Sequence, residues 1–446
     1  MPSEKIASPV REIAKQEDST RLQGNWSWVE ASVWTDRMLA ALENGVKGGR
    51  WYSLMDKVYR MTTLRAAWEK VARNQGAAGV DEVSCKRFGE QSERYLEELS
   101  EALRQGTYRP QAVRRVYISK GKGKQRPLGI PTVKDRVVQK ALQMVLEPIF
   151  EREFAPVSYG FRPGRGCKDA LREVEGWLKA GYHWVVDADL AGYFDTIPHD
   201  RLLEKVARHI SDGRVLELLR AYLKQQVMEG AKNWTPVKGS PQGAVISPLL
   251  ANLYLHDLDT HLTRQGYKMV RFADDFVVLC KSAAQAEAAL AEIESWVETN
   301  GLELHPEKTH VGDCRQPGQG FEFLGYRFEA GRRWVRRKSL KALRDKIRAK
   351  TGRSRGTAMK AIIADLNPTL RGWFEYFKHA ESSTFKPIDG FVRRRLRAIR
   401  RKQSKRPGSG RTFQDHQRWP NAYFARYGLF TMAEARAELV IARQSR

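Results

Sequence analysis

The stretch Arg271–Leu279 places two adjacent aspartates between two apolar runs, and it constrains this chain more than any other feature. The flanking runs, Lys268–Phe272 and Phe276–Cys280, have the composition of strands, so Asp274 and Asp275 are expected on the turn between them. Carboxylates are depleted in strands and costly to bury unpaired. A divalent cation removes that cost, because Mg²⁺ binds one or two carboxylates together with substrate phosphates. A solvated Asp-Asp turn is the alternative interpretation.

A second acidic position lies 85 residues before Asp274, at the end of another strand-like segment. His183–Leu190 alternates in character like a strand, and Asp189 closes it shortly before Gly192. A strand-end aspartate and an aspartate on a hairpin can converge on two ions ~3.5–4 Å apart, which clamp both oxygens of an in-line phosphoryl displacement. Consecutive strand residues point to opposite faces, so Asp275 is expected to support Asp274 as the main ligand.

The segment Lys238–Asn252 begins with a loop rich in Gly, Pro and Ser and continues into an apolar helix expected over 248–258. Such a loop lets the backbone approach a ligand closely. The same pattern is also typical of an ordinary turn before a core helix, so this segment alone does not decide between the two.

Taken in order, Asp189, Ser240–Gly243 and Phe272–Asp275 resemble reverse transcriptases, and in particular the group II intron-encoded reverse transcriptase/maturase family. Further segments resemble motifs of that family in the same order: Asn74–Asp81, Lys120–Pro131, Ser158–Pro163, Leu302–Thr309, Phe323–Tyr326 and Leu370–Phe377. The resemblance extends from about Ser53 to about Phe430. The number and order of these motifs argue against a chance match.

The resemblance implies an α+β, right-hand polymerase with fingers and a palm, whose antiparallel sheet is backed by helices, followed by an α-helical thumb or maturase domain. The expected divisions are a partly disordered N-terminal extension (1–52), fingers (53–181), palm (182–332), thumb or maturase domain (333–403), and a basic linker with a small C-terminal appendix (404–446). Periodicity by itself predicts helices over Phe88–Arg104 and Val137–Phe150 and a strand over Val113–Ser119.

The acidic positions acquire roles from the resemblance. Asp189, Asp274 and Asp275 form the expected catalytic triad, and they would hold two Mg²⁺ ions, or Mn²⁺, with the carbonyl of Leu190 as a further ligand. The reaction would join a primer 3′-oxygen to the α-phosphate of an incoming nucleotide.

Five further residues are expected to bind that nucleotide. Lys120 and Arg126 would hold the triphosphate, where Arg offers a bidentate fork. Gln242 would lie against the sugar or base, and Lys308 would assist at the leaving group. Phe194 occupies the family's sugar-gate position, so it would exclude a 2′-hydroxyl and select dNTPs. A core aromatic of the palm is the plainer interpretation of Phe194, and the two are compatible.

The charge balance indicates a polyanionic partner. The net charge is +26, from 78 Lys+Arg against 52 Asp+Glu, and 10% of residues are aromatic, a combination that favours nucleic acid. Apolar runs fall short of the ~20 residues of a membrane span, and the polar N-terminus lacks a signal-type core. We therefore expect a protein of the bacterial cytosol or nucleoid. The four scattered cysteines suggest reduced thiols and no zinc site.

A basic helix is predicted near the C-terminus, where an apolar stripe is formed by Ile388, Val392, Leu396 and Ile399. Dense like charge on its other faces repels itself, and nucleic-acid phosphates would relieve it. The expected contacts are Arg393, Arg394, Arg397, Arg400, Arg401 and Lys402. A solvated face is the alternative. Because the arginines are separate from the apolar stripe, their replacement is expected to spare the fold.

The resemblance thus implies an RNA-directed DNA polymerase that also helps its group II intron RNA to splice and copies it into DNA during retrohoming. Expected partners are structured intron RNA, an RNA template with a DNA primer, dNTPs and target DNA. Nothing after Gln403 resembles the His-Asn-His endonuclease of longer members, as in bacterial class C introns. Two alternatives stay open: a reverse transcriptase domesticated for defence or repair, and an RNA-binding splicing cofactor only. The intact acidic triad argues against the second.

Overall fold

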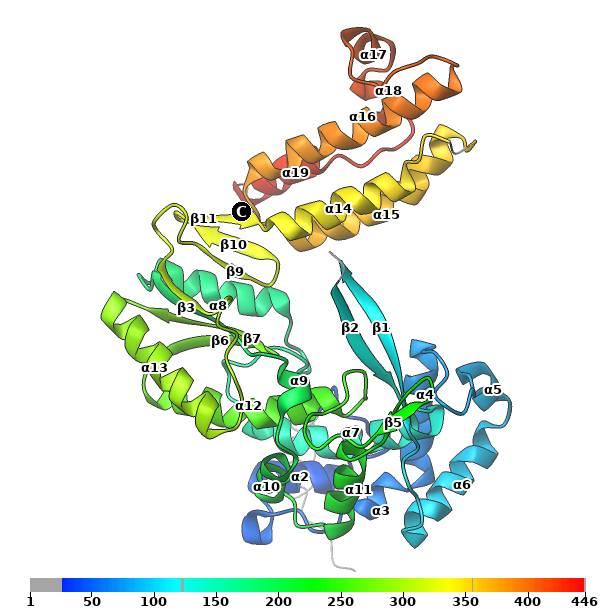
Figure 1. The fold of residues 1–446 in the computed structure, drawn as a ribbon, viewed down its shortest axis with the longest axis vertical. Coiled ribbons are helices and arrows are strands. Elements are labelled where there is room, and N and C mark those ends of the chain that lie inside the picture. The colour runs from blue at the N-terminus through cyan, green and yellow to red at the C-terminus, as the bar shows by residue number, and fades with distance from the viewer. Residues whose placement is uncertain (1–25, 122–123, 355, 445–446) are drawn as a thin grey trace, which may run out of the picture. The chain divides into compact units, whose positions relative to one another are not determined.

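The computed structural model describes residues 26–121, 124–354 and 356–444, which form two compact units (Figure 1). Unit 1 comprises Met1–Tyr182 and Val186–Val311, and unit 2 comprises His183–Val185 and Gly312–Arg446. Fingers and palm therefore share one unit, whereas the strands after Gly312 belong with the C-terminal helices. The predicted, partly disordered N-terminal extension covers 1–52; residues 1–25 lie outside the described residues, whereas the rest includes a helix and a 3₁₀ turn.

Helix α7 (Val133–Glu153) is the central helix of unit 1, with apolar residues buried along most of its length. Thr132 caps it by accepting the Asp135 N–H, and its bounds extend the predicted helix over Val137–Phe150 by one turn at each end. Several helices pack around it: α2 (Asp36–Asn44), α3 (Met55–Val58), α4 (Met61–Asn74) and α6 (Ser92–Gln105). A short 3₁₀ turn, η1 (Lys47–Gly49), follows α2.

A proline in α7 explains how the N-terminal segment is held. Pro148 has no N–H, so the carbonyl of Met144 lacks the donor that an α-helix would give it. The indole of Trp34 supplies that donor, with Nε1 3.0 Å from the Met144 oxygen. Trp34 is 2% exposed, so this part of the predicted N-terminal extension is packed against the fingers.

The predicted helix over Phe88–Arg104 is wrong as a single element, because it is broken at Gln91. Helix α5 (Cys85–Glu90) ends there, and α6 begins at Ser92. Phe88 is fully buried, and its ring contacts those of Trp68 and Tyr95, at centroid distances of 4.5 and 4.9 Å. Packing around Phe88 thus accompanies a break that the periodicity does not reveal.

The fingers carry a four-stranded sheet in the order β2-β1-β4-β5. β1 (Val113–Gly121) and β2 (Lys124–Ile130) form a long antiparallel hairpin, which confirms the predicted strand over Val113–Ser119 (Figure 1). β4 (Val227–Glu229) pairs in parallel with β1 and antiparallel with β5 (Lys232–Trp234).

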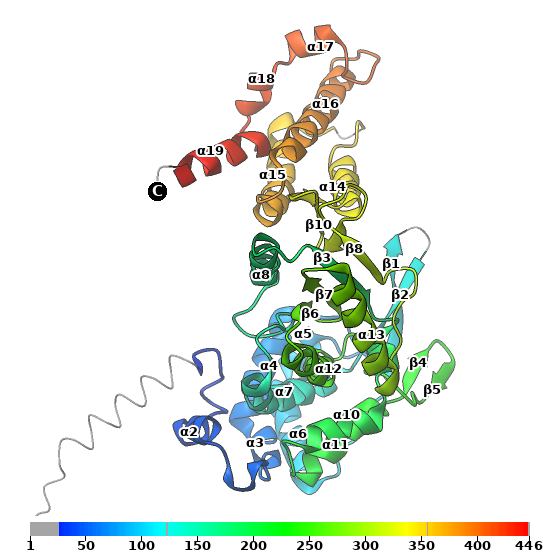
Figure 2. The same cartoon turned by 90° about the vertical axis from the view of Figure 1, so that its left-hand side faces the viewer.

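The palm sheet has the order β6-β7-β3-β8 and carries the acidic residues. Its strands are β3 (Trp184–Asp189), β6 (Lys268–Phe272), β7 (Asp275–Cys280) and β8 (His310–Asp313). Helices α8 (Cys167–Lys179) and α13 (Ala283–Thr299) flank β6 and β7, and α12 (Ser247–Arg264) packs on β6 (Figure 2). The remaining helices of unit 1 are α9 (Tyr193–Thr196), α10 (His199–Ala207) and α11 (Gly213–Leu223).

Unit 2 begins with a small antiparallel sheet, β9 (Phe321–Phe323), β10 (Tyr326–Glu329) and β11 (Arg332–Val335). Three long helices follow, α14 (Arg337–Lys350), α15 (Met359–Phe377) and α16 (Phe385–Gln403), with the 3₁₀ turn η2 (Ser382–Thr384) before α16. The chain then forms α17 (Phe413–Arg418), α18 (Asn421–Ala425) and α19 (Met432–Gln444), and α19 returns to pack on α16. Among the described residues, no helix combines the length and apolar character needed to cross a bilayer.

Candidate active site

The acidic hairpin is a tight turn between β6 and β7. Phe272 pairs with Asp275, so Ala273 and Asp274 are the two turn residues. Ala273 has φ of 61°, a left-handed conformation that favours glycine at this place in a two-residue hairpin. Asp274 is a turn residue, whereas Asp275 begins β7 and so is not on the turn as predicted. The two acids occupy unequal positions because of the turn and not because of the strand pleat.

Asp189 ends β3, and the loop after α13 fixes its backbone. The carbonyl of Asp189 accepts the His305 N–H at 2.7 Å, and Leu190 bridges to Leu304. The Asp189 Oδ1 accepts a hydrogen bond from Lys308 Nζ at 2.8 Å in a half-exposed ion pair. Lys308 is therefore held beside the acidic site by a residue of that site.

The environment of Asp274 includes the charge of Asp189. Burial raises the pKa of Asp274 above its ordinary value, and the charge of Asp189 raises that pKa further, while Arg126 and Arg271 lower it. Within the described ranges, no three acidic, histidine or cysteine side chains gather closely enough to hold an ion alone. Two carboxylates that disfavour one another's charge fit Mg²⁺, which completes its shell with water and substrate phosphates.

Beneath the turn lies a buried ion pair that the sequence reasoning missed. Arg271 and Asp259 are both 0% exposed, and the guanidinium donates to both carboxylate oxygens at 2.6 and 2.5 Å. The Nη1 of Arg271 also donates to the carbonyl of Ala273 at 2.8 Å and to Asn252 Oδ1 at 3.0 Å. The strained residue of the turn is thus fixed from inside the palm. The available signal was a charged residue within each of two apolar elements, β6 and α12.

The segment before α8 supports the same turn from the other side. Gly160 lies so close to the turn that a Cβ there would collide with the backbone nitrogen of Ala273. Its carbonyl accepts from Asn252 Nδ2 at 2.7 Å, and the Tyr159 N–H donates to the Arg271 carbonyl at 2.8 Å. The motif around Ser158–Pro163 is therefore part of the support of the acidic turn.

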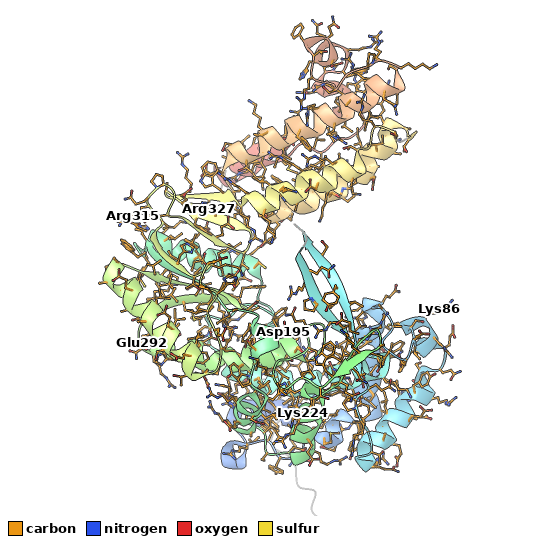
Figure 3. The ribbon with its side chains drawn as sticks, in the orientation of Figure 1. Lys86, Asp195, Lys224, Glu292, Arg315 and Arg327 are labelled. Carbon is orange, nitrogen blue, oxygen red and sulfur yellow. The ribbon has the colours of Figure 1, made fainter. Side chains whose placement is uncertain are left out.

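The loop before α12 joins the fingers hairpin to α9. Gln242 Oε1 accepts from Arg126 Nε at 2.7 Å, and Gln242 Nε2 donates to Asp195 Oδ2 at 3.1 Å. Asp195, labelled in Figure 3, projects from α9. The Gln242 carbonyl also accepts the Gly129 N–H at 2.7 Å. At Gly243, φ is 110°, and a Cβ would collide with the Gly129 carbonyl, so this position requires glycine.

The other predicted nucleotide contacts are distributed as follows. Phe194 is 8% exposed on α9, edge-on to Tyr193, so it has the core packing of the plainer interpretation, and its gate role stays a prediction. The side chain of Lys120 lies outside the described residues. Arg126 is exposed, with one nitrogen engaged by Gln242.

A hollow of about 440 Å³ opens beside the Gln242 loop. Arg115, Asp195, Trp234 and Gln242 contribute to its lining. The Arg115 guanidinium lies 5.3 Å from the Trp234 ring centroid, and Trp234 is 39% exposed. Trp234 did not stand out in the sequence, because β5 has only three residues, all of them exposed.

The basic helix α16 corrects one prediction. Arg397 is 2% exposed, and its Nε and Nη2 donate to the Trp419 carbonyl and Asn421 Oδ1 at 2.9 and 3.0 Å. Arg401 forms an ion pair at 2.9 Å with Asp415, which is 4% exposed. These two side chains hold α17 and α18 and are not an open phosphate-binding face. These contacts argue against the expectation that replacing the two arginines would spare the fold.

Two family models match this chain. The model described as reverse transcriptase (RNA-dependent DNA polymerase) matches residues 118–328, and the group II intron, maturase-specific domain matches residues 340–419. Protein YkfC of Escherichia coli K12 is 36% identical over 291 residues, covering 56% of this chain and 75% of YkfC. Group II intron-encoded protein LtrA of Lactococcus lactis subsp. cremoris is 38% identical over 208 residues, covering 46% of this chain and 34% of LtrA.

The first match covers β6, β7 and the Gln242 loop, and the second covers most of α14 and all of α15 to α17. Fingers and a palm bearing an acidic pair, followed by a helical domain, define the class of RNA-directed DNA polymerases. Within that class, the chain belongs to the group II intron-encoded reverse transcriptase/maturase family. The predicted family, fold class and reaction class are confirmed. The chain spans about a third of the length of LtrA.

Proposed function

We propose that this chain copies its group II intron RNA into DNA by two-metal nucleotidyl transfer during retrohoming, and that it also helps that RNA to splice. The observation that carries the proposal is the placement of Asp189 at the end of β3 and of Asp274 on the turn before β7, the strand beside β3. The charge of Asp189 is close enough to raise the pKa of Asp274. Such a pair invites cations, and the fingers bring Arg126 close enough to act on Asp274. This combination suits a triphosphate bound through metal ions.

In this proposal, Asp189, Asp274 and Asp275, with the carbonyl of Leu190, hold two Mg²⁺ ions, or Mn²⁺. When bound, the ions would activate the primer 3′-oxygen and neutralise charge on the transferred and leaving phosphates. Lys308 donates to Asp189 Oδ1, which holds its ammonium beside the acidic site, where it would assist at the leaving group. The buried Arg271 donates to the Ala273 carbonyl and so fixes the turn that carries Asp274.

Selection of the nucleotide is assigned to residues around the Gln242 loop. Arg126 would use its remaining guanidinium nitrogens on the triphosphate, together with Lys120. Gln242 would orient Arg126 and meet the sugar or base, and Phe194 would exclude a 2′-hydroxyl. The hydrogen bonds from Arg126 to Gln242 and from Gln242 to Asp195 support this assignment, because they orient the loop before any substrate arrives.

Binding of RNA is assigned to the basic surface of the chain as a whole. The net charge of +26 supports contact with intron RNA, with an RNA template and DNA primer, and with target DNA. Structured RNA is recognised by shape, phosphates and 2′-hydroxyls, which suits a distributed basic surface. The maturase-specific match over residues 340–419 favours an intron-associated role over one in defence or repair.

The test is primer extension on an RNA template by Asp189→Asn and Asp274→Asn variants. Each change deletes a metal ligand, so extension should fall by roughly a hundredfold or more, since a bound ion supplies several kcal/mol of charge stabilisation. Affinity for RNA should stay nearly unchanged, because no phosphate contact is removed. Chelation of divalent ions should abolish wild-type extension, and added Mg²⁺ should restore it.

Asp200→Asn is the matched control, because Asp200 is an exposed aspartate in the first turn of α10. Its extension rate should equal that of the wild type. Wild-type rates from Asp189→Asn or Asp274→Asn would refute the two-metal assignment.

A further inference from the structure

A second charged hollow lies wholly within unit 2. It has a volume of about 280 Å³ and is formed between α16 and the chain that follows it. Its lining includes Gly390, Arg393, Arg394, Arg397, Arg411 and His416. Four arginines thus line a hollow with ample room for a phosphate group, far along the chain from the acidic residues.

A close backbone crossing builds this hollow. Gly410 has φ of 75°, and a Cβ there would lie 2.6 Å from Ala398 N and 2.9 Å from the Arg394 carbonyl. Only glycine lets the loop lie so near α16. The crossing brings Arg411 next to Arg394, and the charge of Arg411 helps to lower the pKa of Arg394, after burial as the main cause.

The positive charges in the hollow have few partners. Arg397 donates to two neutral acceptors, the Trp419 carbonyl and Asn421 Oδ1. Among the described residues, no hydrogen bond or ion pair is formed by the guanidiniums of Arg393, Arg394 and Arg411.

The nearby carboxylates are occupied elsewhere. Asp415 pairs with Arg401 and also accepts from Thr412, at 2.9 and 2.8 Å. Asp389, which feels the charge of Arg393, accepts the backbone N–H groups of Met432 and Ala433 at 3.0 and 2.9 Å. The hollow is therefore electropositive by construction.

A glycine on the helix keeps one wall of the hollow open. Gly390 lies inside α16, where glycine costs about 1 kcal/mol relative to alanine. A Cβ at this position would meet nothing within 4 Å, so packing gives no reason for the glycine. The glycine is instead explained by the space that it leaves for a ligand between α16 and the arginines of the hollow.

We propose that this hollow is a phosphate-binding pocket that receives one internal backbone phosphate of the RNA–DNA template–primer. The inference rests on the proposed function, and it replaces the open basic face expected of α16 with a discrete site. Guanidinium forks match phosphate oxygens in pairs, and a buried, oriented Arg397 beside three less buried arginines suits that geometry. No base edge is read, so the pocket fixes position and not sequence.

The pocket is tested with Arg394→Ala/Arg411→Ala in the full chain, using a fluorescent RNA–DNA template–primer as probe. Loss of one phosphate contact should make the slope of log K against log salt shallower by roughly 0.7–0.9. Affinity should fall equally for probes of different sequence. Arg406→Ala is the control, since Arg406 is exposed in the same loop and does not line the hollow. An unchanged slope in the folded double variant would overturn the pocket.

A second variant pair tests the pocket without removing an arginine. Gly390→Asp should place a carboxylate among the guanidiniums and lower probe affinity several-fold, whereas the neutral Gly390→Asn should lower it less. Equal effects of Asp and Asn would contradict the electrostatic assignment.

Three further arms identify the source of the phosphate and separate the two proposals. A 5′-phosphate on the probe should change nothing, and an effect confined to 5′-phosphorylated probes would overturn the internal-phosphate assignment. Stabilisation by inorganic phosphate, with probe binding unaffected by the variants, would assign the pocket to a free anion and overturn it likewise. Failure of the wild type to extend primers would instead sink the proposed function, whereas the pocket fails only if its variants bind the probe as the wild type does.

Discussion

Arg271 grips both carboxylate oxygens of Asp259 at a depth where neither residue touches solvent. Buried ion pairs contribute little net stability, because the cost of removing two charges from water offsets their attraction. The pair instead serves to hold Arg271 in position beneath the turn. With its charge neutralised by Asp259, Arg271 can donate to the carbonyl of Ala273 and fix the turn that carries Asp274.

We predict that Arg271→Met separates position from stability. The single variant leaves Asp259 buried and unpaired, so the free energy of unfolding should drop by about 3–5 kcal/mol. Arg271→Met/Asp259→Leu should recover much of that loss in urea titrations. Primer extension by the double variant should nevertheless stay low, because the Ala273 carbonyl and Asn252 Oδ1 lose the hydrogen bonds that Arg271 donates. A double variant with wild-type extension would mean that the pair is only structural.

The sugar gate gives a second prediction. Phe194→Ala should admit ribonucleotides, because the ring would no longer occlude the 2′-hydroxyl. The preference for dNTPs over rNTPs should fall by roughly 10- to 200-fold, the range given by one change of pocket shape. Single-nucleotide incorporation kinetics measure it, with Tyr193→Phe as the control for altered packing on α9. Unchanged discrimination would leave Phe194 as a core residue.

The bond between Arg126 and Gln242 predicts coupled kinetics. Arg126→Ala and Gln242→Ala should each raise the KM for dNTPs, since each removes part of one oriented unit. Their combined effect should be smaller than the sum of the two, with an interaction energy of about 0.5–3 kcal/mol. Strict additivity in the double-mutant cycle would show that the two side chains act independently.

Asp135 should make stability depend on pH. It is 1% exposed, and burial raises its pKa to about 6, despite hydrogen bonds from Tyr108 and the Gln111 N–H. The folded state therefore holds a proton that the unfolded state, with an Asp pKa of about 3.9, releases. The free energy of unfolding should fall as pH rises from about 4 to 6, and this stabilisation is lost above that range.

Asp135→Asn should remove that dependence. Between about pH 4 and pH 7, its free energy of unfolding should change less than that of the wild type by up to about 3 kcal/mol, at about 1.4 kcal/mol per pKa unit. Comparing the change with pH, and not the absolute stability, cancels the effect of altered hydrogen bonding. Parallel pH profiles would exclude Asp135 as the titrating group.

Arg401→Ala should loosen the end of the chain. The change leaves Asp415 nearly buried without its charged partner, at a cost of about 2 kcal/mol. Limited proteolysis should then cut within 404–421 faster than in the wild type. Lys402→Ala, on the exposed side of the same helix, should be cut at the wild-type rate. Equal rates in both variants would show that the ion pair does not hold α17.

Local pattern was sufficient for the acidic hairpin. Apolar runs around Asp274 and Asp275 predict two strands, and β6 and β7 confirm them to within a residue. Apolar spacing likewise predicts the buried stripe of α16, from Ile388 to Ile399. These features follow from residues adjacent in the chain, where period and composition act directly.

The rest depends on pairings between distant segments. The sequence of β6 does not predict that Arg271 pairs with Asp259. The sequence of residues 26–52 likewise does not predict that Trp34 donates to the Met144 carbonyl, which Pro148 leaves without a helical donor. Arg397 looks like one more charge on a basic face until the loop with Gly410 folds over it. A run of basic residues in the sequence predicts a positive charge, but it does not predict which groups those residues contact.

During synthesis, Arg401 is made before Asp415, its ion-pair partner in the folded chain. Helix α16 emerges from the ribosome before Asp415, Trp419 and Asn421, which receive two of its arginines. Until Asp415, Trp419 and Asn421 have been synthesised, Arg397 and Arg401 lack these hydrogen-bond and ion-pair partners. Any RNA bound to the nascent helix would therefore compete with the contacts that dock α17 and α18.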